Sequence, residues 1–248
     1  MLQELLGANK SREERQAESL NKKAMDLIAR NQLDRAEEAL LQAIKIKPDM
    51  GAAHHNLGAV YLAQKKLSPA LKHMRRAVRL DPHDIESQIA VARIYGDMGK
   101  REECLAEYTR ICQEAPDDWR SQISLGNALL ERGQTAEAIE HLERAVQLNP
   151  KEELTHLVLA TAYERQGDLE RAVKEYRAVR NTTRVRQNRS AASHKMRELQ
   201  VRLVQEGKRT ASELQPLPLA GVLARFANIK VERRQLGPPD TEQPEKAD

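Results

Sequence analysis

The 248-residue sequence is poor in aromatic residues (3%), contains only two cysteines and has no long run of apolar residues. A membrane-spanning helix needs about 18 or more consecutive apolar residues, so the sequence predicts no membrane span. The first seven residues include Glu4 and too short an apolar stretch for a secretory signal. With 40% hydrophobic and 31% charged residues, the composition is that of a soluble helical protein. The expected location is cytoplasmic.

Sequence motifs typical of disulfides, metal sites and catalytic sites are also absent. Cys104 and Cys112 stand eight residues apart in one predicted helix. This corresponds to a rise of about 12 Å, which is too long for a disulfide, and the pair lacks the spacing of zinc ligands. No Gly-rich phosphate loop, nucleophile elbow or pair of histidines four residues apart occurs. We therefore predict that the protein is not an enzyme and has no catalytic residues, no metal site and no cofactor.

The sequence does contain a regular period. Pro48, Pro82, Pro116 and Pro150 are each separated by 34 residues. A fixed period of this size indicates stacked structural repeats. Repeats of this kind usually bind other molecules rather than transform them.

Other residue types recur in register with the prolines. Small residues occupy two columns, small or branched residues a third, and larger residues, including all five tyrosines, two others. Small residues opposite large ones let two helices pack closely. In chain order the columns are Ala24, Gly58, Ala92, Gly126, Ala160; Leu27, Tyr61, Tyr95, Leu129, Tyr163; Ala36, Ala70, Cys104, Ala138, Ala172; Leu40, Met74, Tyr108, Leu142, Tyr176; and Ala43, Ala77, Ile111, Ala145, Val179.

Within each unit the apolar spacing of three or four residues predicts two helices. Asn31, Gly99, Gly133 and Gly167 lie between the two halves of their units, where a left-handed residue can end a helix. Lys65 holds this place in the second unit, and we expect its turn to close differently.

Two further signals mark the ends of these helices. Ser68 and Pro69 suggest an N-cap followed by a first-turn proline. The periodic prolines end the second helix of each unit, since proline cannot continue a helix. The acids that follow them suit the positive end of the next helix, namely Asp49, Asp84, Asp117, Asp118 and Glu152.

These columns resemble the tetratricopeptide repeat. The resemblance rests on Leu57-Gly58-x-x-Tyr61 followed by Ala70, Met74, Ala77 and Pro82, and on Leu125-Gly126 followed by Ala138, Leu142, Ala145 and Pro150. It covers five units, with Lys23 in place of an apolar residue in the first and Arg184 in place of a proline in the fifth. It implies an all-α, right-handed α-solenoid of about five helix pairs with a C-terminal capping helix, and a role in protein–protein interaction.

The predicted organisation follows the repeat boundaries. A stripe formed by Ala192, Met196, Leu199 and Leu203 predicts the capping helix. Beyond it, residues 219–229 predict an amphipathic helix that could dock on a partner or in the protein's own groove. The predicted parts are an N-terminal helical lead-in (1–16), five repeats (17–184), the capping helix (185–207), a basic extension with the amphipathic helix (208–234) and a disordered tail (235–248).

The resemblance also implies a binding surface, because the first helix of each repeat lines the concave face. This face is predicted to be largely apolar and to hold an extended or helical peptide, with Asn56, Arg93 and Asn127 bonding its backbone or a carboxylate. The candidate groove residues are Asn21, Met25, His55, Asn56, Leu62, Ile89, Arg93, Ile123, Asn127, Leu130 and Thr161.

A subset of the family clamps the acidic C-termini of heat-shock chaperones, and this sequence lacks most of that pattern. Of the five places, only Asn56 matches, while Asn21, Met25, Glu86 and Ala90 occupy the others. Glu86 would repel a carboxylate, so we reject this particular role.

The uneven distribution of charge along the sequence leaves more than one function open for its basic segment. Residues 174–234 hold 15 Lys or Arg against 5 Asp or Glu. This segment could bind nucleic acid or an anionic membrane, or it could be a solvated helix face.

The predicted function is a non-catalytic adaptor or scaffold that binds a protein. The alternatives are association through the basic segment and a role as an accessory subunit of a secretion or enzyme complex. The partner, the pathway and the oligomeric state do not follow from the sequence.

Overall fold

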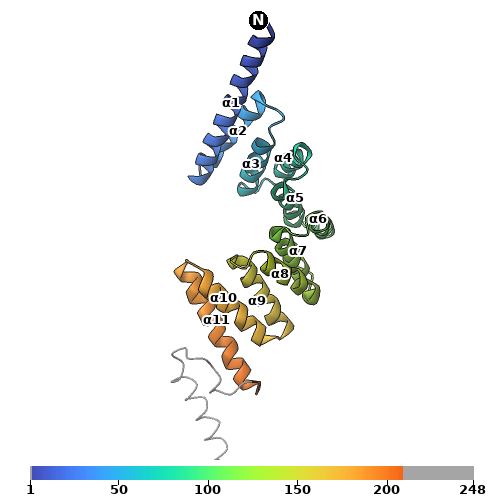
Figure 1. Ribbon diagram of the computed structural model, residues 1–248, viewed down its shortest axis with the longest axis vertical. Helices are drawn as coiled ribbons and strands as arrows, with labels where there is room; N and C mark the ends of the chain where they lie inside the picture. Colours follow the sequence, from blue (N-terminus) through green and yellow to red (C-terminus); the bar gives the residue numbers. More distant parts are fainter. Residues whose placement is uncertain (1, 209–248) are drawn as a thin grey trace, which may run out of the picture. The chain divides into compact units, whose positions relative to one another are not determined.

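The structure, a computed structural model, describes residues 2–208, with side chains from residue 12 onward. This part of the chain is all-α and contains eleven helices (Figure 1). The chain divides into two compact units, Met1–Pro150 and Lys151–Asp248. The helices are α1 (Leu2–Ala29), α2 (Leu33–Ile46), α3 (Gly51–Ala63), α4 (Leu67–Leu80), α5 (Ile85–Asp97), α6 (Arg101–Glu114), α7 (Trp119–Glu131), α8 (Thr135–Leu148), α9 (Glu153–Gln166), α10 (Leu169–Thr182) and α11 (Arg186–Gln205).

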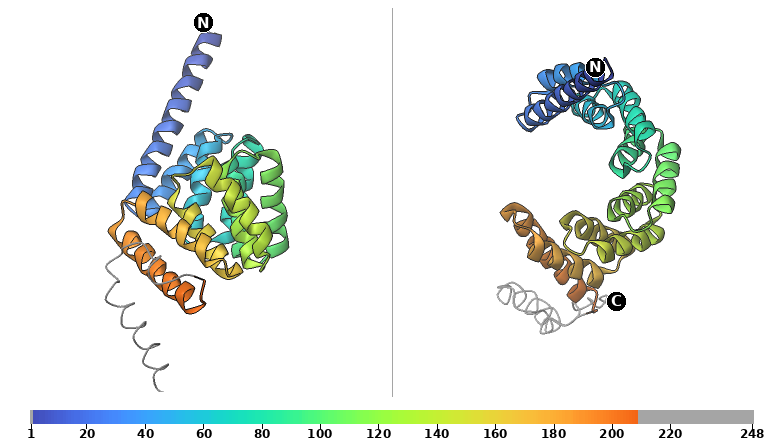
Figure 2. Two further views of the ribbon diagram at one scale, coloured as in Figure 1. Left: turned by 60° about the horizontal axis from the view of Figure 1, so that its bottom comes forward. Right: turned by 45° about the horizontal axis from the view of Figure 1, so that its top comes forward.

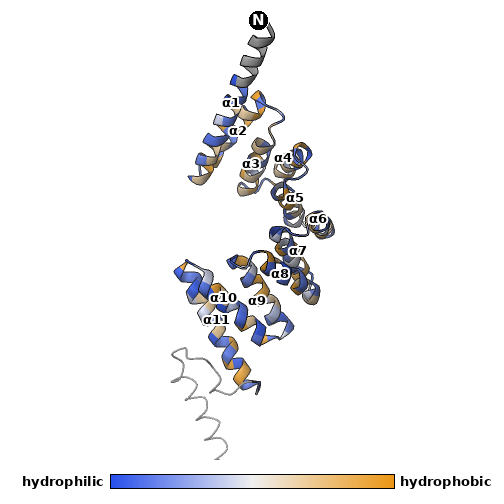
Figure 3. Ribbon diagram, in the orientation of Figure 1, coloured by the Kyte–Doolittle hydropathy of each residue, from blue (hydrophilic) through white to orange (hydrophobic). Residues whose placement is uncertain are grey.

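The first unit is a stack of antiparallel helix pairs. Helices α1 and α2, α3 and α4, α5 and α6, and α7 and α8 pack as pairs, and each pair packs on the next (Figure 2). Figure 3 shows hydrophobic and hydrophilic residues interleaved along these helices. Large apolar side chains of α2, α4, α6 and α8, namely Leu40, Met74, Ile111 and Leu142, are buried in the packing of these pairs. This arrangement confirms the predicted all-α solenoid of helix pairs.

The second unit contains α9, α10 and α11. Helix α10 packs against both α9 and α11. The stripe predicted for the capping helix, from Ala192 to Leu203, is buried in α11. The segments predicted as a basic extension and a tail lie, from residue 209 on, outside the described residues. No described helix is long and apolar enough to cross a membrane.

Close packing inside a pair depends on the facing columns of small and large residues. A Cβ atom added at Gly58 would lie 2.7 Å from Met74 Cγ, and one added at Gly126 would lie 2.7 Å from Leu142 Cγ. Real Cβ atoms do not approach other atoms this closely, so glycine is needed for α3 to contact α4 and for α7 to contact α8 at these points.

The turn inside each repeat closes through a residue in the left-handed conformation. Gly99, Gly133 and Gly167 have φ of 76°, 79° and 84°, and Asn31 has φ of 56°. The expectation that Lys65 closes its turn differently is wrong, because its φ is 60°. The following amide, Lys66 N, donates to Tyr61 O, as Lys100 N does to Tyr95 O in the next repeat. The repeat geometry therefore imposes this conformation even on a residue with a Cβ atom.

Only some of the acids that follow the periodic prolines cap the next helix. Asp84, Asp118 and Glu152 cap α5, α7 and α9 by accepting hydrogen bonds from backbone amides. Asp49 does not cap α3, whose N-cap residue is Met50. The prediction that Ser68 is an N-cap is also wrong, since α4 begins at Leu67 and Lys66 occupies the cap position.

The structure also contains a column of buried polar residues with the same 34-residue spacing. His54, Gln88, Gln122 and His156 are 5–6% exposed. The first three bind the carbonyl oxygen of the periodic proline six residues earlier, which ties the start of one repeat to the end of the previous one. The bonds join His54 Nε2 to Pro48 O (3.1 Å), Gln88 Nε2 to Pro82 O (2.6 Å) and Gln122 Nε2 to Pro116 O (3.1 Å).

Candidate functional site

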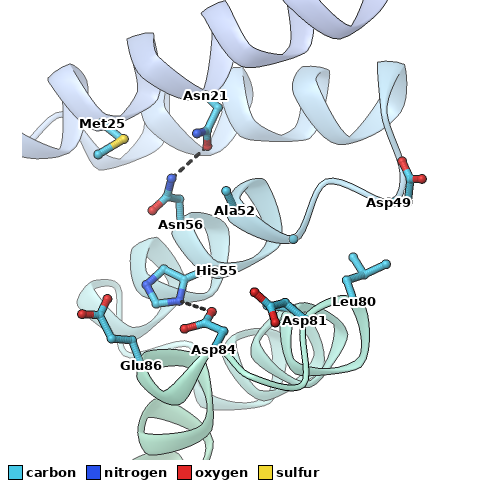
Figure 4. A pocket seen from close by; sticks show the side chains of 12 residues that line it. Asn21, Met25, Asp49, Ala52, His55, Asn56, Leu80, Asp81, Asp84 and Glu86 are labelled. Atoms are coloured by element: carbon cyan, nitrogen blue, oxygen red, sulfur yellow. Dashed lines mark hydrogen bonds and ion pairs between the residues drawn. The ribbon is translucent and has the colours of Figure 1, made fainter. Parts of the chain in front are cut away.

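The first helices of three successive repeats enclose a pocket in the first unit. It has a volume of about 520 Å³ and is formed by α1, α3, the C-terminal end of α4, α5 and the turns that precede α3 and α5 (Figure 4). It brings together four of the eleven predicted groove residues, namely Asn21, Met25, His55 and Asn56. The other lining residues are Asp49, Gly51, Ala52, Ala77, Leu80, Asp81, Asp84 and Glu86.

Hydrogen bonds fix the polar side chains of the pocket. Asn56 Nδ2 donates to Asn21 Oδ1 at 2.8 Å, which links α3 to α1. Each of these amides keeps a second polar atom that the bond does not use. His55 Nδ1 lies 2.7 Å from Ser87 Oγ and 3.7 Å from Asp84 Oδ2. These contacts orient groups that can bond to the backbone of a polypeptide.

The electrostatic character of the pocket differs from the prediction. Four carboxylates line it, from Asp49, Asp81, Asp84 and Glu86, and no lysine or arginine is among its lining residues. Arg120 lies 2.7 Å from Glu86, and Asp84 accepts a bond from Ser87 N as the cap of α5. The expectation of a largely apolar lining is wrong for this part of the face, because four of its residues are acids. Bonding of a carboxylate by the face stays a prediction.

Apolar surface is nevertheless present beside the acids. Met25 is 54% exposed although it is a large apolar side chain, and Figure 4 shows it next to Asn56 in the pocket. Leu80 and Ala52 also line the pocket. The site therefore offers both apolar contact and negative charge to a single ligand.

The remaining predicted groove residues are not part of this pocket. Arg93 and Asn127 are exposed on α5 and α7. Ile123 and Leu130 are only 8% and 4% exposed, so they contribute mainly to packing between helices. Leu62 and Ile89 are half-buried, and Thr161 lies on α9 in the second unit, where it donates to Leu157 O.

The acids of the pocket are not among the predicted groove residues. Asp49, Asp81 and Asp84 stand in the turns beside the periodic prolines. The sequence indicates Asp49 and Asp84 as helix-end charges and assigns no role to Asp81. Glu86 was used only to reject a carboxylate ligand. The signal that would have found them is their number, because four acids lie within 38 residues on segments that the repeat brings to one side.

The two cysteine thiols are not exposed. Cys104 and Cys112 are free and buried, and burial raises the pKa of both thiols, that of Cys112 to about 11. Among the side chains the structure describes, no group of three or more His, Cys, Asp or Glu could hold a metal ion.

Part of the basic segment can be followed in α10 and α11. Several of its cations pair with acids of the same unit: Lys195 lies 3.4 Å from both Glu164 and Glu198, and Arg202 lies 3.5 Å from Glu206. These contacts are those of a solvated helix face. Residues 209–234 of the segment lie outside the described part of the chain.

Comparisons with known proteins agree with this architecture. A tetratricopeptide repeat model matches residues 21–85 and 90–153, and a second tetratricopeptide repeat model matches residues 129–192. The chain therefore belongs to the tetratricopeptide repeat family, as the resemblance predicted. No curated protein sequence matches it.

Solved structures of other repeat proteins share the fold. Pseudomonas aeruginosa pilF superposes with a TM-score of 0.64 at 17% identity, over 89% of this chain and 99% of that one. TTC0263, a thermophilic TPR protein of Thermus thermophilus, superposes with a TM-score of 0.62 at 18% identity, over 73% of this chain and 98% of that one. YrrB, described as a TPR protein with an unusual peptide-binding site, superposes with a TM-score of 0.51 at 16% identity, over 71% of this chain and 89% of that one.

Membership of the family gives the chain a general role. Tetratricopeptide repeats act as scaffolds for protein–protein interaction, and proteins built from them are generally not catalysts. Which surface binds, and what it binds, depends on the particular side chains of this protein.

Proposed function

We propose that this protein is a non-catalytic adaptor that holds a peptide or helical segment of a partner protein in the pocket between α1, α3 and α5. The observation that carries the proposal is the pocket itself, with a volume of about 520 Å³ and an exposed methionine in its lining. A concave site that combines apolar surface with a few fixed polar groups is the usual form of a ligand site.

The repeat architecture explains why a partner can be bound without rearrangement. Buried polar bonds to Pro48 O and Pro82 O fix successive repeats to one another around the pocket. A preformed site loses less conformational entropy on binding than a mobile one. The description of YrrB as a peptide-binding repeat protein agrees with such a use of the fold. The cytoplasmic location stays a prediction.

The proposal is tested by blocking the pocket. Ala52 is exposed on α3 and lines the pocket, so Ala52→Trp should fill much of it. Peptides selected on the wild-type protein from a random phage library should lose at least about tenfold in affinity for this variant. The matched control is Ala106→Trp, at an exposed position of α6 that is not in the pocket.

The two tryptophan variants separate the possible outcomes. Loss of binding in Ala52→Trp, with retention in Ala106→Trp, supports the pocket as the peptide site. Equal binding by both variants would show that the selected peptides attach elsewhere, and the proposal would then be abandoned.

A further inference from the structure

The charge of the pocket narrows the chemistry of its occupant. Of the four carboxylates that line it, Glu86 has a cationic partner in Arg120, and Asp84 is held by Ser87. Asp49 and Asp81 are both exposed, and no lysine or arginine of the described residues forms an ion pair with either. The pocket therefore has an excess of negative charge at neutral pH.

The placement of these acids suits an extended group better than a point charge. Figure 4 shows Asp49 and Glu86 at opposite ends of the labelled set, with Asp81 and Asp84 between them. The exposed thioether side chain of Met25 lies within the same pocket. A ligand that uses both features needs an aliphatic part for the apolar surface and a positive charge for the carboxylates.

Lysine and arginine side chains have this form. Their aliphatic stems bury against apolar surface while the charged head stays among polar groups. Arginine can in addition bond a carboxylate through two parallel N–H groups. An acidic side chain would be repelled at the same place, and a neutral one would leave the carboxylates without a counter-charge.

We infer that the segment bound in the pocket carries lysine or arginine side chains, whose stems contact apolar lining such as Met25 and whose charged heads face the carboxylates of Asp49 and Asp81. The inference rests on the proposed function and names the partner chemistry of the same site. The occupant is a segment of another protein. In the amphipathic segment 219–229 of this chain, Arg225 is the one charged residue, so this segment matches the charge of the pocket less well than a segment with several cations.

The test uses the full chain and five pools of fluorescent nine-residue peptides with random flanks. The central residue is fixed as Arg, Lys, Gln, Glu or Leu, and binding is followed by fluorescence anisotropy. We expect the Arg and Lys pools to bind at least about fivefold more tightly than the Gln and Glu pools. We also expect this preference to shrink as the NaCl concentration rises from about 50 to about 500 mM.

Charge-neutral variants locate the preference in the pocket. Asp49→Asn combined with Asp81→Asn keeps the shape of the pocket and the cap of α5 but removes the two carboxylates that form no ion pair with a described lysine or arginine. It should reduce the affinity for the Arg pool about fivefold or more and leave the affinity for the Leu pool within about twofold. The matched control is Glu38→Gln combined with Glu140→Gln, which removes two exposed carboxylates of the same unit outside the pocket.

Each outcome decides between the two proposals. Equal binding of the Arg, Gln and Glu pools, or equal loss in the test and control variants, overturns the cationic preference. If the Leu pool then binds best and Ala52→Trp abolishes this binding, the pocket is still the peptide site but has no preference for a cationic residue. If Ala52→Trp affects no pool, both proposals fail.

Discussion

Gly126 lies directly against the side chain of Leu142, and a methyl group at Gly126 would sit 2.7 Å from Leu142 Cγ and 3.3 Å from Ala138 O. Alanine is the better helix former by about 1 kcal/mol. The overlap with a core side chain and a backbone oxygen should nevertheless outweigh this gain. We expect Gly126→Ala to lower the free energy of unfolding by about 1–3 kcal/mol, as measured by urea denaturation.

Gly51→Ala is the matched control. It lies at the start of α3, and an added Cβ would meet Leu80 Cβ at an ordinary 3.6 Å. This variant should be neutral or slightly more stable than the wild type. A stabilised Gly126→Ala would mean that α7 and α8 can separate at no cost, contrary to the packing described above.

Lys65 adopts the left-handed conformation that glycine occupies in three other repeats. This conformation costs a residue with a Cβ atom about 1–2 kcal/mol, partly offset because glycine gains more entropy on unfolding. Lys65→Gly should therefore stabilise the protein by about 0.5–1 kcal/mol, which is a rise of about 1–4 °C in Tm for a chain of this size.

Lys72→Gly provides the opposite control for this prediction. Lys72 is an exposed residue inside α4, where glycine should cost about 1 kcal/mol. Differential scanning calorimetry on both variants measures the two shifts. A fall in Tm for Lys65→Gly would show that its side chain stabilises the turn by more than its backbone strains it.

His54, which is buried, and His73, which is half-buried, form a contact that should make stability depend on pH. Their Nδ1 atoms lie 3.0 Å apart, and their rings stack at 5.2 Å. Burial, and then the neighbouring His54 and Lys72, lower the pKa of His73 to about 4. Burial also lowers the pKa of His54, with Arg76 and Arg79 acting in the same direction and the bond to Pro48 O opposing them.

The sign of the effect follows from these directions. Between pH 6.5 and about 4 the unfolded chain binds more protons at these histidines than the folded chain, so stability falls as the pH falls. For His73 the loss between pH 7 and pH 5 should be about 1–2 kcal/mol. His73→Gln retains a polar partner for His54 but does not titrate, so it should show a smaller loss. Urea denaturation at both pH values tests this, with the exposed His83→Gln as the control.

The repeat and its two helices could be predicted because they depend on side-chain periodicity alone. The columns at Gly58 and Met74 meet as expected, since a 34-residue period fixes which residues face each other. The conformation of Lys65 could not be predicted from its own type, because its repeat imposes a backbone that lysine alone rarely adopts.

The candidate site was predicted less completely. The first helices of the repeats supplied Asn21, Met25, His55 and Asn56 to the pocket, as the resemblance implied. The charge of the pocket depends equally on residues of the turns, such as Asp49 and Asp81. Their side chains reach the pocket because the stacking of successive repeats brings these turns beside the first helices, and no local sequence pattern specifies this.

A final prediction concerns the hypothesis that the amphipathic segment 219–229 occupies the protein's own groove. A chain that ends at Lys208 keeps the bond from Lys208 N to Leu203 O that closes α11. Because Arg225 is the one charged residue of segment 219–229, we expect the affinity for the Arg-centred peptide pool to change by less than about twofold. Fluorescence anisotropy on the full and shortened chains measures this directly. A gain of about fivefold or more in the shortened chain would instead identify the C-terminal segment as a competitor for the pocket, and self-docking would replace the partner segment as the resting state of the site.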